Sequence, residues 1–199
     1  MTLVLDKKGK TKYKETYEHV HERHQSYHEI NCGMRYMDLW LPAVSLKTPI
    51  LDVGCGNGML CWEMFDRGYG ITGMDIIEIP YHRRGYKYVQ HDITQVPWPF
   101  DDNAYHLAMA FDVLEHLDDD DLDSTVKEFC RVSKGQVASI PDAKGQGKLH
   151  RIIKPGDWWL KRLNSTVPGW RICDEHHRNK EKNGKQILIT TSIFVRQGV

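Results

Sequence analysis

Short apolar runs separated by amphipathic segments recur along most of the chain, a pattern typical of parallel strands that alternate with helices. Five runs predict strands of this kind: 50–53, 70–75, 86–90, 105–111 and 135–141. Two further runs, 170–173 and 186–195, lie on either side of the turn-forming pair Asn183-Gly184 and predict two closing strands. We therefore expect one α/β domain with a seven-stranded, mostly parallel sheet and an antiparallel C-terminal strand pair.

Apolar positions at three- and four-residue spacing predict helices between these strands. One helix is expected from about residue 58 to 68, and another over residues 118–132. Two helical segments are expected between residues 15 and 41. We interpret residues 1–42 as an N-terminal helical cap and residues 48–199 as the core of a single domain.

Composition narrows the classes of protein that fit this pattern. At 199 residues the chain is long enough for one domain with a sizeable core. The 27 basic residues balance the 27 acidic ones, so no overall charge favours a nucleic acid or an anionic membrane. No apolar run is long enough for a transmembrane helix, and the N-terminus does not resemble a signal peptide. The five cysteines form no Cys-x-x-Cys pair, and we expect a reduced, cytoplasmic protein.

A glycine-rich turn follows the first strand, where residues 50–58 read ILDVGCGNG. Gly54 and Gly56 lack a Cβ atom, so the backbone can take a positive φ and a ligand can approach it closely. The next helix directs its free N–H groups at the turn. A dinucleotide fingerprint requires a glycine where this chain has Met59. Asp75 ends the second strand, about where an acidic residue binds ribose hydroxyls, so the pattern favours a nucleoside without a diphosphate.

Four blocks of the sequence together resemble the class I S-adenosylmethionine-dependent methyltransferases that act on small molecules. They are LDVGCGNG at 51–58, Asp75, HDI at 91–93 and DVLEHL at 112–117, in that family's order and spacing. The resemblance implies a three-layer α/β/α, Rossmann-like methyltransferase fold. It implies S-adenosyl-L-methionine as cofactor and S-adenosyl-L-homocysteine as product. The cofactor-binding residues that it implies are Asp52, Gly54, Cys55, Gly56, Gly58, Asp75, Ile76, Asp92, Ile93 and Asp112.

Three of these residues have roles that the resemblance makes specific. Asp92 accepts a hydrogen bond from the adenine amino group, with a backbone N–H beside it on the ring. Ile76 lines the adenine, and Asp112 borders the methionine part of the cofactor. The alternatives from the residues themselves are a cap on the following segment for each aspartate and an ordinary core position for Ile76.

Groups suited to acid–base chemistry and to acceptor binding lie near the ends of the fourth and fifth strands. His116 and His150 are candidate catalytic residues, because an imidazole can take a proton from a hydroxyl or an amine near neutral pH. Glu115, Trp158 and Trp159 are candidates for binding the acceptor. The alternatives are a hydrogen bond from His116 to the backbone and packing of the two tryptophans onto the sheet.

We expect no metal site. His21, His24 and His28 share one helical face but have no cysteine or carboxylate at metal-site spacing. Residues 118–121 are four contiguous aspartates that point in different directions and suit a helix N-terminus. The cysteine and two histidines in residues 173–177 are a single short cluster that needs a further ligand.

The function we infer from the sequence is methyl transfer from S-adenosylmethionine to an oxygen, nitrogen or carbon of a small molecule. A nucleic-acid or protein methyltransferase is one alternative. The neutral charge disfavours nucleic acid, and no Asn-Pro-Pro-Tyr type motif follows the fourth strand. A non-catalytic S-adenosylmethionine-binding scaffold, or a regulatory partner of another enzyme, is the other alternative.

Overall fold

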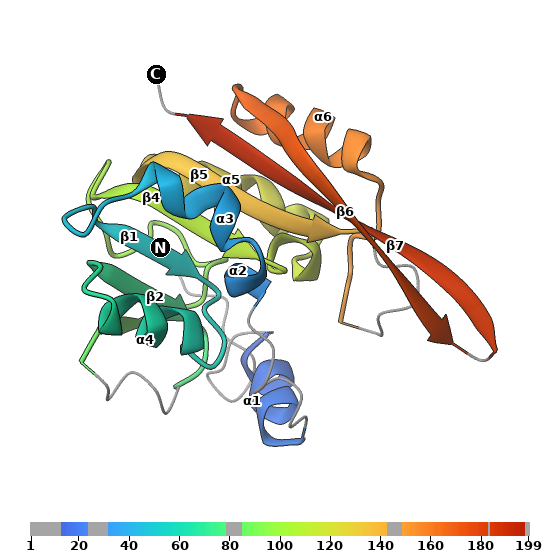
Figure 1. Ribbon diagram of the computed structural model, residues 1–199, viewed down its shortest axis with the longest axis horizontal. Coiled ribbons are helices and arrows are strands. Elements are labelled where there is room, and N and C mark those ends of the chain that lie inside the picture. Colours follow the sequence, from blue (N-terminus) through green and yellow to red (C-terminus); the bar gives the residue numbers. More distant parts are fainter. Residues whose placement is uncertain (1–12, 24–31, 79–84, 143–148, 183, 198–199) are drawn as a thin grey trace.

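A seven-stranded sheet runs through the centre of the computed structural model (Figure 1). The structure describes residues 13–23, 32–78, 85–142, 149–182 and 184–197. The strand order is β3-β2-β1-β4-β5-β7-β6, with the first five strands parallel and β7 antiparallel to both neighbours. The strands are β1 (Ile50–Val53), β2 (Ile71–Asp75), β3 (Lys87–Gln90), β4 (Tyr105–Phe111), β5 (Ser133–Pro141), β6 (Trp170–Lys182) and β7 (Lys185–Gln197). The predicted fold class is confirmed.

Helices lie on both faces of this sheet (Figure 1). The α-helices are α1 (Lys14–Arg23), α2 (Cys32–Arg35), α3 (Met37–Trp40), α4 (Met59–Asp66), α5 (Asp119–Arg131) and α6 (Gly156–Thr166). Two short 3₁₀ helices are η2 (Leu41–Ala43) and η4 (Leu114–His116). The expected helices at 58–68 and 118–132 correspond to α4 and α5. No helix in the described ranges is long and apolar enough to cross a membrane.

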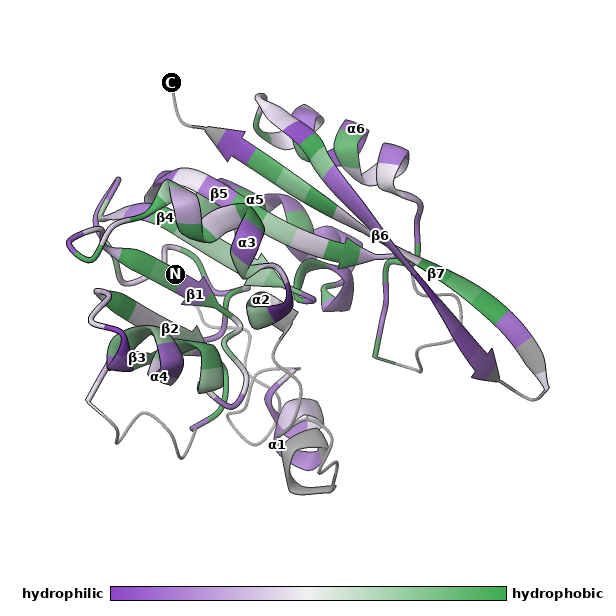
Figure 2. Cartoon of the chain, in the orientation of Figure 1, coloured by the Kyte–Doolittle hydropathy of each residue, from purple (hydrophilic) through white to green (hydrophobic). Residues whose placement is uncertain are grey.

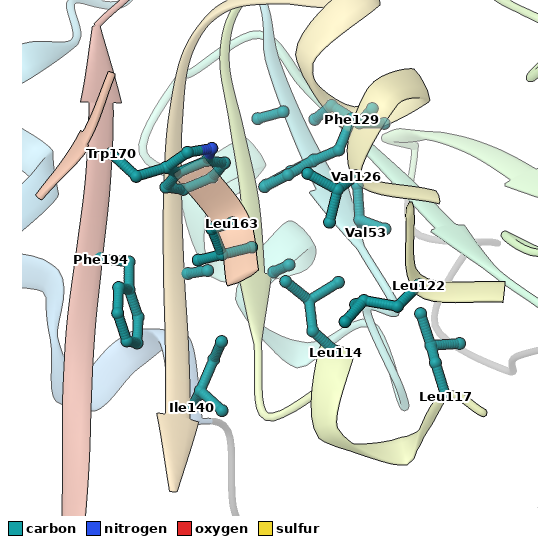
Figure 3. Packing of buried hydrophobic residues seen from close by; sticks show 14 of the residues in the cluster. Val53, Leu114, Leu117, Leu122, Val126, Phe129, Ile140, Leu163, Trp170 and Phe194 are labelled. Carbon is teal, nitrogen blue, oxygen red and sulfur yellow. The ribbon is translucent and has the colours of Figure 1, made fainter. Parts of the chain in front are cut away.

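The alternation of side chains along β1 explains the three layers. Ile50 and Leu51 are both fully buried, but they belong to two different hydrophobic clusters. Successive residues of a strand point to opposite faces, so a strand that is buried throughout must be covered on both sides. Figure 3 shows the cluster on one side, in which α5 places Val126 and Phe129 near Val53 of β1. The other cluster contains residues of α4 and of the segment with α2 and α3.

Strand β6 is much longer than the sequence predicts. The pattern indicates a strand over 170–173 followed by a charged connection, whereas the structure continues the strand to Lys182. That prediction of the strand end was wrong. Residues 175–181 are exposed, so the buried alternation that signals a strand is absent from them. Their backbone nevertheless pairs with β7 up to Lys182. The outer half of β6 is hydrophilic in colour, while much of β7 is hydrophobic (Figure 2).

Candidate functional site

A cavity lies at the carboxyl ends of β1, β2 and β4, the edge of a parallel sheet where ligands bind. Its empty volume is about 640 Å³, including the part open to solvent. Eight of the residues singled out in the sequence line it: Gly54, Gly56, Asp75, Ile76, Asp92, Ile93, Asp112 and His116. The structure therefore brings together residues from four separate stretches of the chain.

The glycine turn forms one wall of the cavity in a conformation that requires glycine. Gly54 and Gly56 have φ angles of 67° and 58°, in the left-handed region that other residues rarely adopt. A Cβ atom on Gly54 would lie 2.7 Å from a methyl group of Val113, so a side chain does not fit there. A Cβ on Gly56 would meet no described atom within 4 Å. At Gly56, the backbone is therefore open to close approach by a ligand.

Asp75 is fixed by two backbone donors at the end of β2. Its Oδ2 accepts a hydrogen bond from the Gly56 N–H at 2.8 Å, and its Oδ1 accepts one from Ile77 at 3.3 Å. Burial raises the pKa of this carboxyl to about 6, against the opposing effect of these backbone donors. Each carboxylate oxygen can accept a second hydrogen bond. The geometry thus leaves acceptor capacity for the hydroxyls of a ribose at the cavity wall.

Asp92 has one satisfied oxygen and one unsatisfied oxygen. Its Oδ1 accepts hydrogen bonds from the N–H and the hydroxyl of Thr94, at 3.0 and 2.8 Å. This is the capping role considered as the alternative. Its Oδ2 is buried and has no hydrogen-bond partner within the described part of the chain. A buried acceptor without a donor costs about 1–3 kcal/mol. The amino group of an adenine bound in the cavity fits this unpaired acceptor.

Three residues predicted to bind the cofactor lie outside the described cavity lining. Asp52 is buried within β1, where the Cys61 thiol donates a hydrogen bond to its Oδ2 at 3.5 Å. Burial raises the pKa of Asp52 to about 7 and that of the Cys55 thiol to about 11. Gly58 has a φ of 74° and stands immediately before α4. These residues shape the turn from inside the protein.

After β4, the chain enters the site at Asp112 and continues into the η4 turn. Asp112 has a φ of 56°, and its Oδ1 accepts a hydrogen bond from the Ser139 hydroxyl at 3.0 Å. The Asp112 N–H donates to the backbone carbonyl of the same serine at 3.1 Å. The unusual backbone angle turns the chain away from the sheet immediately after the strand. Asp112, Val113 and His116 consequently all line the cavity.

His116 is held by the backbone rather than poised as a free base. Its Nδ1 lies 3.2 Å from the carbonyl oxygen of Leu149, which can only accept, so Nδ1 carries the hydrogen. Burial, followed by the neighbouring His150, lowers the pKa of His116 to about 3. Such an imidazole is neutral at pH 7 and a weak acceptor of protons. The structural alternative considered for His116 agrees with this geometry.

Glu115 and His150 lie next to His116 and do not line the described cavity. The ring centroids of the two histidines are 4.6 Å apart. Glu115 is fully buried, and burial, followed by the charge of Asp112, raises the pKa of its carboxyl well above its usual range. Burial also lowers the pKa of His150. The buried Glu115 and His116 thus form one group with the partly buried His150 beside the cavity.

The two tryptophans lie on α6, away from the described cavity lining. Trp159 is completely buried in the hydrophobic cluster that contains α5, and Trp158 is partly buried against it. The Lys154 ammonium lies 5.7 Å from the centroid of the Trp158 ring. These positions agree with the packing role that was the alternative for both residues.

The sequence predicted an N-terminal helical cap, and the resemblance implied that residues 13–41 cover the cofactor cleft, but neither identified the residues that line the cavity. Tyr13 and Tyr17 line the cavity, and the Tyr17 ring lies edge-on to His116 with centroids 6.1 Å apart. The Tyr13 hydroxyl donates to Asp121 at 2.8 Å and accepts from the Asp118 N–H at 2.9 Å. A Lys-rich N-terminal segment gives no signal for these long-range contacts. Of the N-terminal histidines weighed as metal ligands, His24 and His28 lie outside the described residues.

Comparison with known proteins agrees with this geometry. A family model described as a methyltransferase domain matches residues 51–138. A structure of the 1,6-didemethyltoxoflavin-N1-methyltransferase of Burkholderia thailandensis, with S-adenosylhomocysteine bound, is similar at a TM-score of 0.70 and 14% identity, over 94% of this chain and 87% of that one. The N-methyltransferase NodS of Bradyrhizobium japonicum WM9, also with S-adenosylhomocysteine, has a TM-score of 0.64 and 10% identity, over 94% and 99%.

One curated relative shares a shorter stretch. The ubiquinone biosynthesis O-methyltransferase of Nitrosomonas europaea is 44% identical over 50 residues, which are 25% of this chain and 21% of that protein. The alignment thus spans about a fifth of the length of that relative. At 14% and 10% identity, the two solved structures show the fold alone.

Proposed function

We propose that this chain transfers a methyl group from S-adenosylmethionine to a small-molecule acceptor. Its residues 51–138 match a methyltransferase domain, and the fold is that of the class I S-adenosylmethionine-dependent enzymes. The observation that carries the proposal is the unpartnered Oδ2 of Asp92 in a cavity shared with Asp75 and the open backbone of Gly56. The nucleoside of this cofactor requires a carboxylate for its ribose, an acceptor for its adenine amino group and an open glycine turn.

Each residue has a role in holding the cofactor. Asp75 accepts hydrogen bonds from the ribose hydroxyls while Gly56 and Ile77 keep its carboxylate in place. Asp92 accepts from the adenine amino group, and Ile76 packs on the ring. The bound cofactor supplies an electrophilic methyl group on a sulfonium. The remaining task of the protein is to align the acceptor with the methyl carbon and the sulfur, since near-attack geometry is a large part of such catalysis.

Charge and the site favour a small acceptor over a macromolecule. The chain carries 27 basic and 27 acidic residues, so it lacks the excess positive charge that nucleic-acid binding uses. The first residues of the described chain, Tyr13 and Tyr17, line the cavity together with the glycine turn. We propose that the described part of the helical cap around α1 covers the cofactor in this way and leaves room for a compact acceptor.

Calorimetric titration with S-adenosylmethionine and S-adenosylhomocysteine tests the cofactor, with NAD as the control ligand. We expect micromolar binding of the first two and none of NAD. Absence of binding to either would overturn the proposal. Methyl-labelled cofactor offered with pools of small hydroxylated or amino compounds, total RNA and a protein extract then tests the acceptor. Label that enters only RNA or protein would replace the small-molecule assignment, and binding without transfer to any pool would favour the scaffold.

A further inference from the structure

Three potential metal ligands from two distant segments meet beside the cofactor cavity. Glu115 and His116 belong to η4, and His150 belongs to the segment that precedes α6. One ligand atom from each side chain lies within 4.8 Å of the other two. Two ligands of one tetrahedral cation at about 2.1 Å are about 3.4 Å apart. The three ligand atoms therefore need to approach one another by up to about 1.4 Å to share an ion.

The carboxylate of Glu115 lacks the partners that a buried carboxylate normally has. It is completely buried, and neither oxygen has a hydrogen-bond partner among the residues that the structure describes. Its Oε1 lies 3.8 Å from Nε2 of His116, beyond hydrogen-bond distance. The nearby Asp112 adds negative charge instead of compensating it. Buried carboxylates are usually paired or bound to a metal, so this group is suited to a cation.

The two imidazoles are oriented for the same point. Because His116 donates from Nδ1 to the Leu149 carbonyl, its Nε2 keeps a free lone pair on the side of Glu115. Metal-bound histidines typically use their second nitrogen in this way. Nδ1 of His150 is buried and has no hydrogen-bond partner within the described ranges. Each histidine thus has one nitrogen available to an ion.

Backbone hydrogen bonds hold the two segments together without an ion. The carbonyl oxygen of Glu115 accepts from the N–H groups of Arg151 and Ile152, at 2.9 and 3.0 Å. With the bond from His116 to Leu149, these contacts fix residues 149–152 against η4. The ligand positions are therefore set by the fold, which lowers the cost of ordering them when an ion binds.

From this geometry we propose that Glu115, His116 and His150 bind a divalent transition-metal ion. Two imidazoles and one carboxylate suit Zn²⁺, Co²⁺, Fe²⁺ and Mn²⁺ better than Mg²⁺ or Ca²⁺, which prefer oxygen ligands throughout. Three protein ligands leave coordination positions open, as in catalytic zinc sites. His116 lines the cofactor cavity, so an ion bound to it would lie beside that cavity.

The site also defines a class of acceptor, an extension that rests on the proposed methyl transfer. Two open positions on the ion bind two adjacent oxygens of the acceptor, as in a catechol. The ion lowers the pKa of a bound hydroxyl, whose proton leaves to water. The resulting oxygen anion attacks the methyl carbon, the carbon–sulfur bond breaks, and its electron pair remains on sulfur to give S-adenosylhomocysteine. In this scheme no separate general base is needed, and His116 acts as a ligand.

Cobalt titration tests the metal site in a way that does not depend on activity. Protein freed of metals with EDTA is titrated with Co²⁺ while the visible absorption is recorded. We expect one Co²⁺ per chain, displaced by Zn²⁺, and binding at least tenfold weaker in Glu115→Gln and His150→Ala. His177→Ala, which removes an exposed imidazole on β6, serves as the matched control and should bind like wild type. Equal binding by all four proteins, or none by wild type, would overturn the proposal.

Thermal unfolding separates loss of the site from loss of the fold. Glu115→Gln keeps the shape of the side chain and removes only the buried carboxyl group, so without metal it should unfold near the wild-type temperature. Saturating Co²⁺ should raise the unfolding temperature of wild type and leave that of Glu115→Gln unchanged. An equal rise in both proteins would place the ion elsewhere.

The two levels of the proposal fail in different ways. Cofactor binding without Co²⁺ binding would remove the metal site and leave the methyltransferase. Co²⁺ binding without cofactor binding would leave the metal site and remove the proposed methyl transfer. For the acceptor class, a dihydroxybenzoate should be methylated only with metal present, while its monohydroxy analogue should not be methylated. Equal transfer to both compounds, or transfer to neither, would overturn the chelating acceptor.

Discussion

Asp52 and Asp75 lie on neighbouring parallel strands, yet their carboxylates have different surroundings. Asp75 ends β2 at the cavity and accepts from two backbone N–H groups. Asp52 lies inside β1, and its Oδ2 accepts a hydrogen bond from the weakly donating thiol of Cys61. Asp75 can therefore bind a ligand because it lies at the end of its strand, whereas Asp52 lies within its strand and contacts the protein interior.

Replacing Asp75 with asparagine should weaken S-adenosylmethionine binding about 10- to 100-fold. The physical reason is the loss of a charged acceptor for the ribose, worth about 1.5–3 kcal/mol. Calorimetric titration gives the change directly. Asp66→Asn, an exposed position at the end of α4, is the control and should bind normally. Wild-type affinity in Asp75→Asn would remove this residue from the ribose site.

Asp52 should make stability depend on pH. Its pKa is raised by burial to about 7 in the folded protein, against about 3.9 when unfolded. The unfolded chain therefore releases its proton first, and folding stability falls as the pH rises from about 4 to 7. The full effect is on the order of 4 kcal/mol.

The asparagine side chain in Asp52→Asn cannot ionise, so the stability of this variant should not show this fall with rising pH. Urea unfolding at pH 5 and pH 8 should show the variant gaining a few kcal/mol on wild type between the two values. Asp66→Asn controls for the general effect of removing one carboxylate. A difference between variant and wild type that stays constant with pH would contradict the assignment.

Short elements at the edge of the sheet supply the residues of the site, while the long strands and helices make up the fold. The 3₁₀ turn η4 supplies Glu115 and His116, and the end of β4 supplies Asp112. The helix α1 is fixed through Tyr13, which bonds both to Asp118 and to Asp121 at the start of α5. The Tyr13 hydroxyl thus helps to fix this N-terminal element over the cavity, together with the contact between the Tyr17 and His116 rings.

Tyr13→Phe should loosen α1 while leaving the core unchanged. Loss of the hydroxyl removes two hydrogen bonds, each worth about 0.5–1.5 kcal/mol. We expect S-adenosylmethionine affinity to fall about three- to tenfold and trypsin to cleave at Lys14 or Arg23 more quickly. The temperature of global unfolding should change little. Tyr69→Phe, away from the cavity, is the control, and equal cleavage rates in both variants would contradict the role of Tyr13.

The local hydrophobic pattern was sufficient to predict the sheet, the glycine turn and the helices α4 and α5 on the faces of the sheet. The positive φ of Gly54 and Gly56 and the wall position of Asp75 follow from short-range chemistry, so the sequence predicted them. The extension of β6 could not be predicted, because exposed strand residues lack alternation. The approach of His150 to Glu115 depends on a tertiary backbone contact, and nothing in local spacing encodes it.

On the scale of the whole molecule, the cavity is built from parts of both hydrophobic clusters. Leu117 belongs to the cluster with α5, and Ile76 packs against the cluster with α4, yet both residues line the cavity. A ligand in this cavity therefore contacts residues that pack with each of the two clusters. Its binding is therefore linked to the unfolding of the domain as a unit.

Saturating cofactor should accordingly stabilise the whole domain. At 100 times its Kd, S-adenosylmethionine adds about 2.7 kcal/mol, which raises the unfolding temperature of a chain of this size by about 5–10 °C. Differential scanning calorimetry measures the shift. Asp75→Asn at the same cofactor concentration should show a smaller one. A shift that is equal in both proteins would indicate binding outside the cavity.

The long β6 strand has a consequence for the behaviour of the protein in concentrated solution. β6 ends the sheet, and no strand in the described part of the chain pairs with the edge of β6 that faces away from β7. Such edges invite fibril formation. Residues 174–182 are all polar or charged, and the pairing is irregular between Ile172 and Asp174. Charges and an irregular register both hinder the addition of a foreign strand. The charged segment thus protects the domain against aggregation.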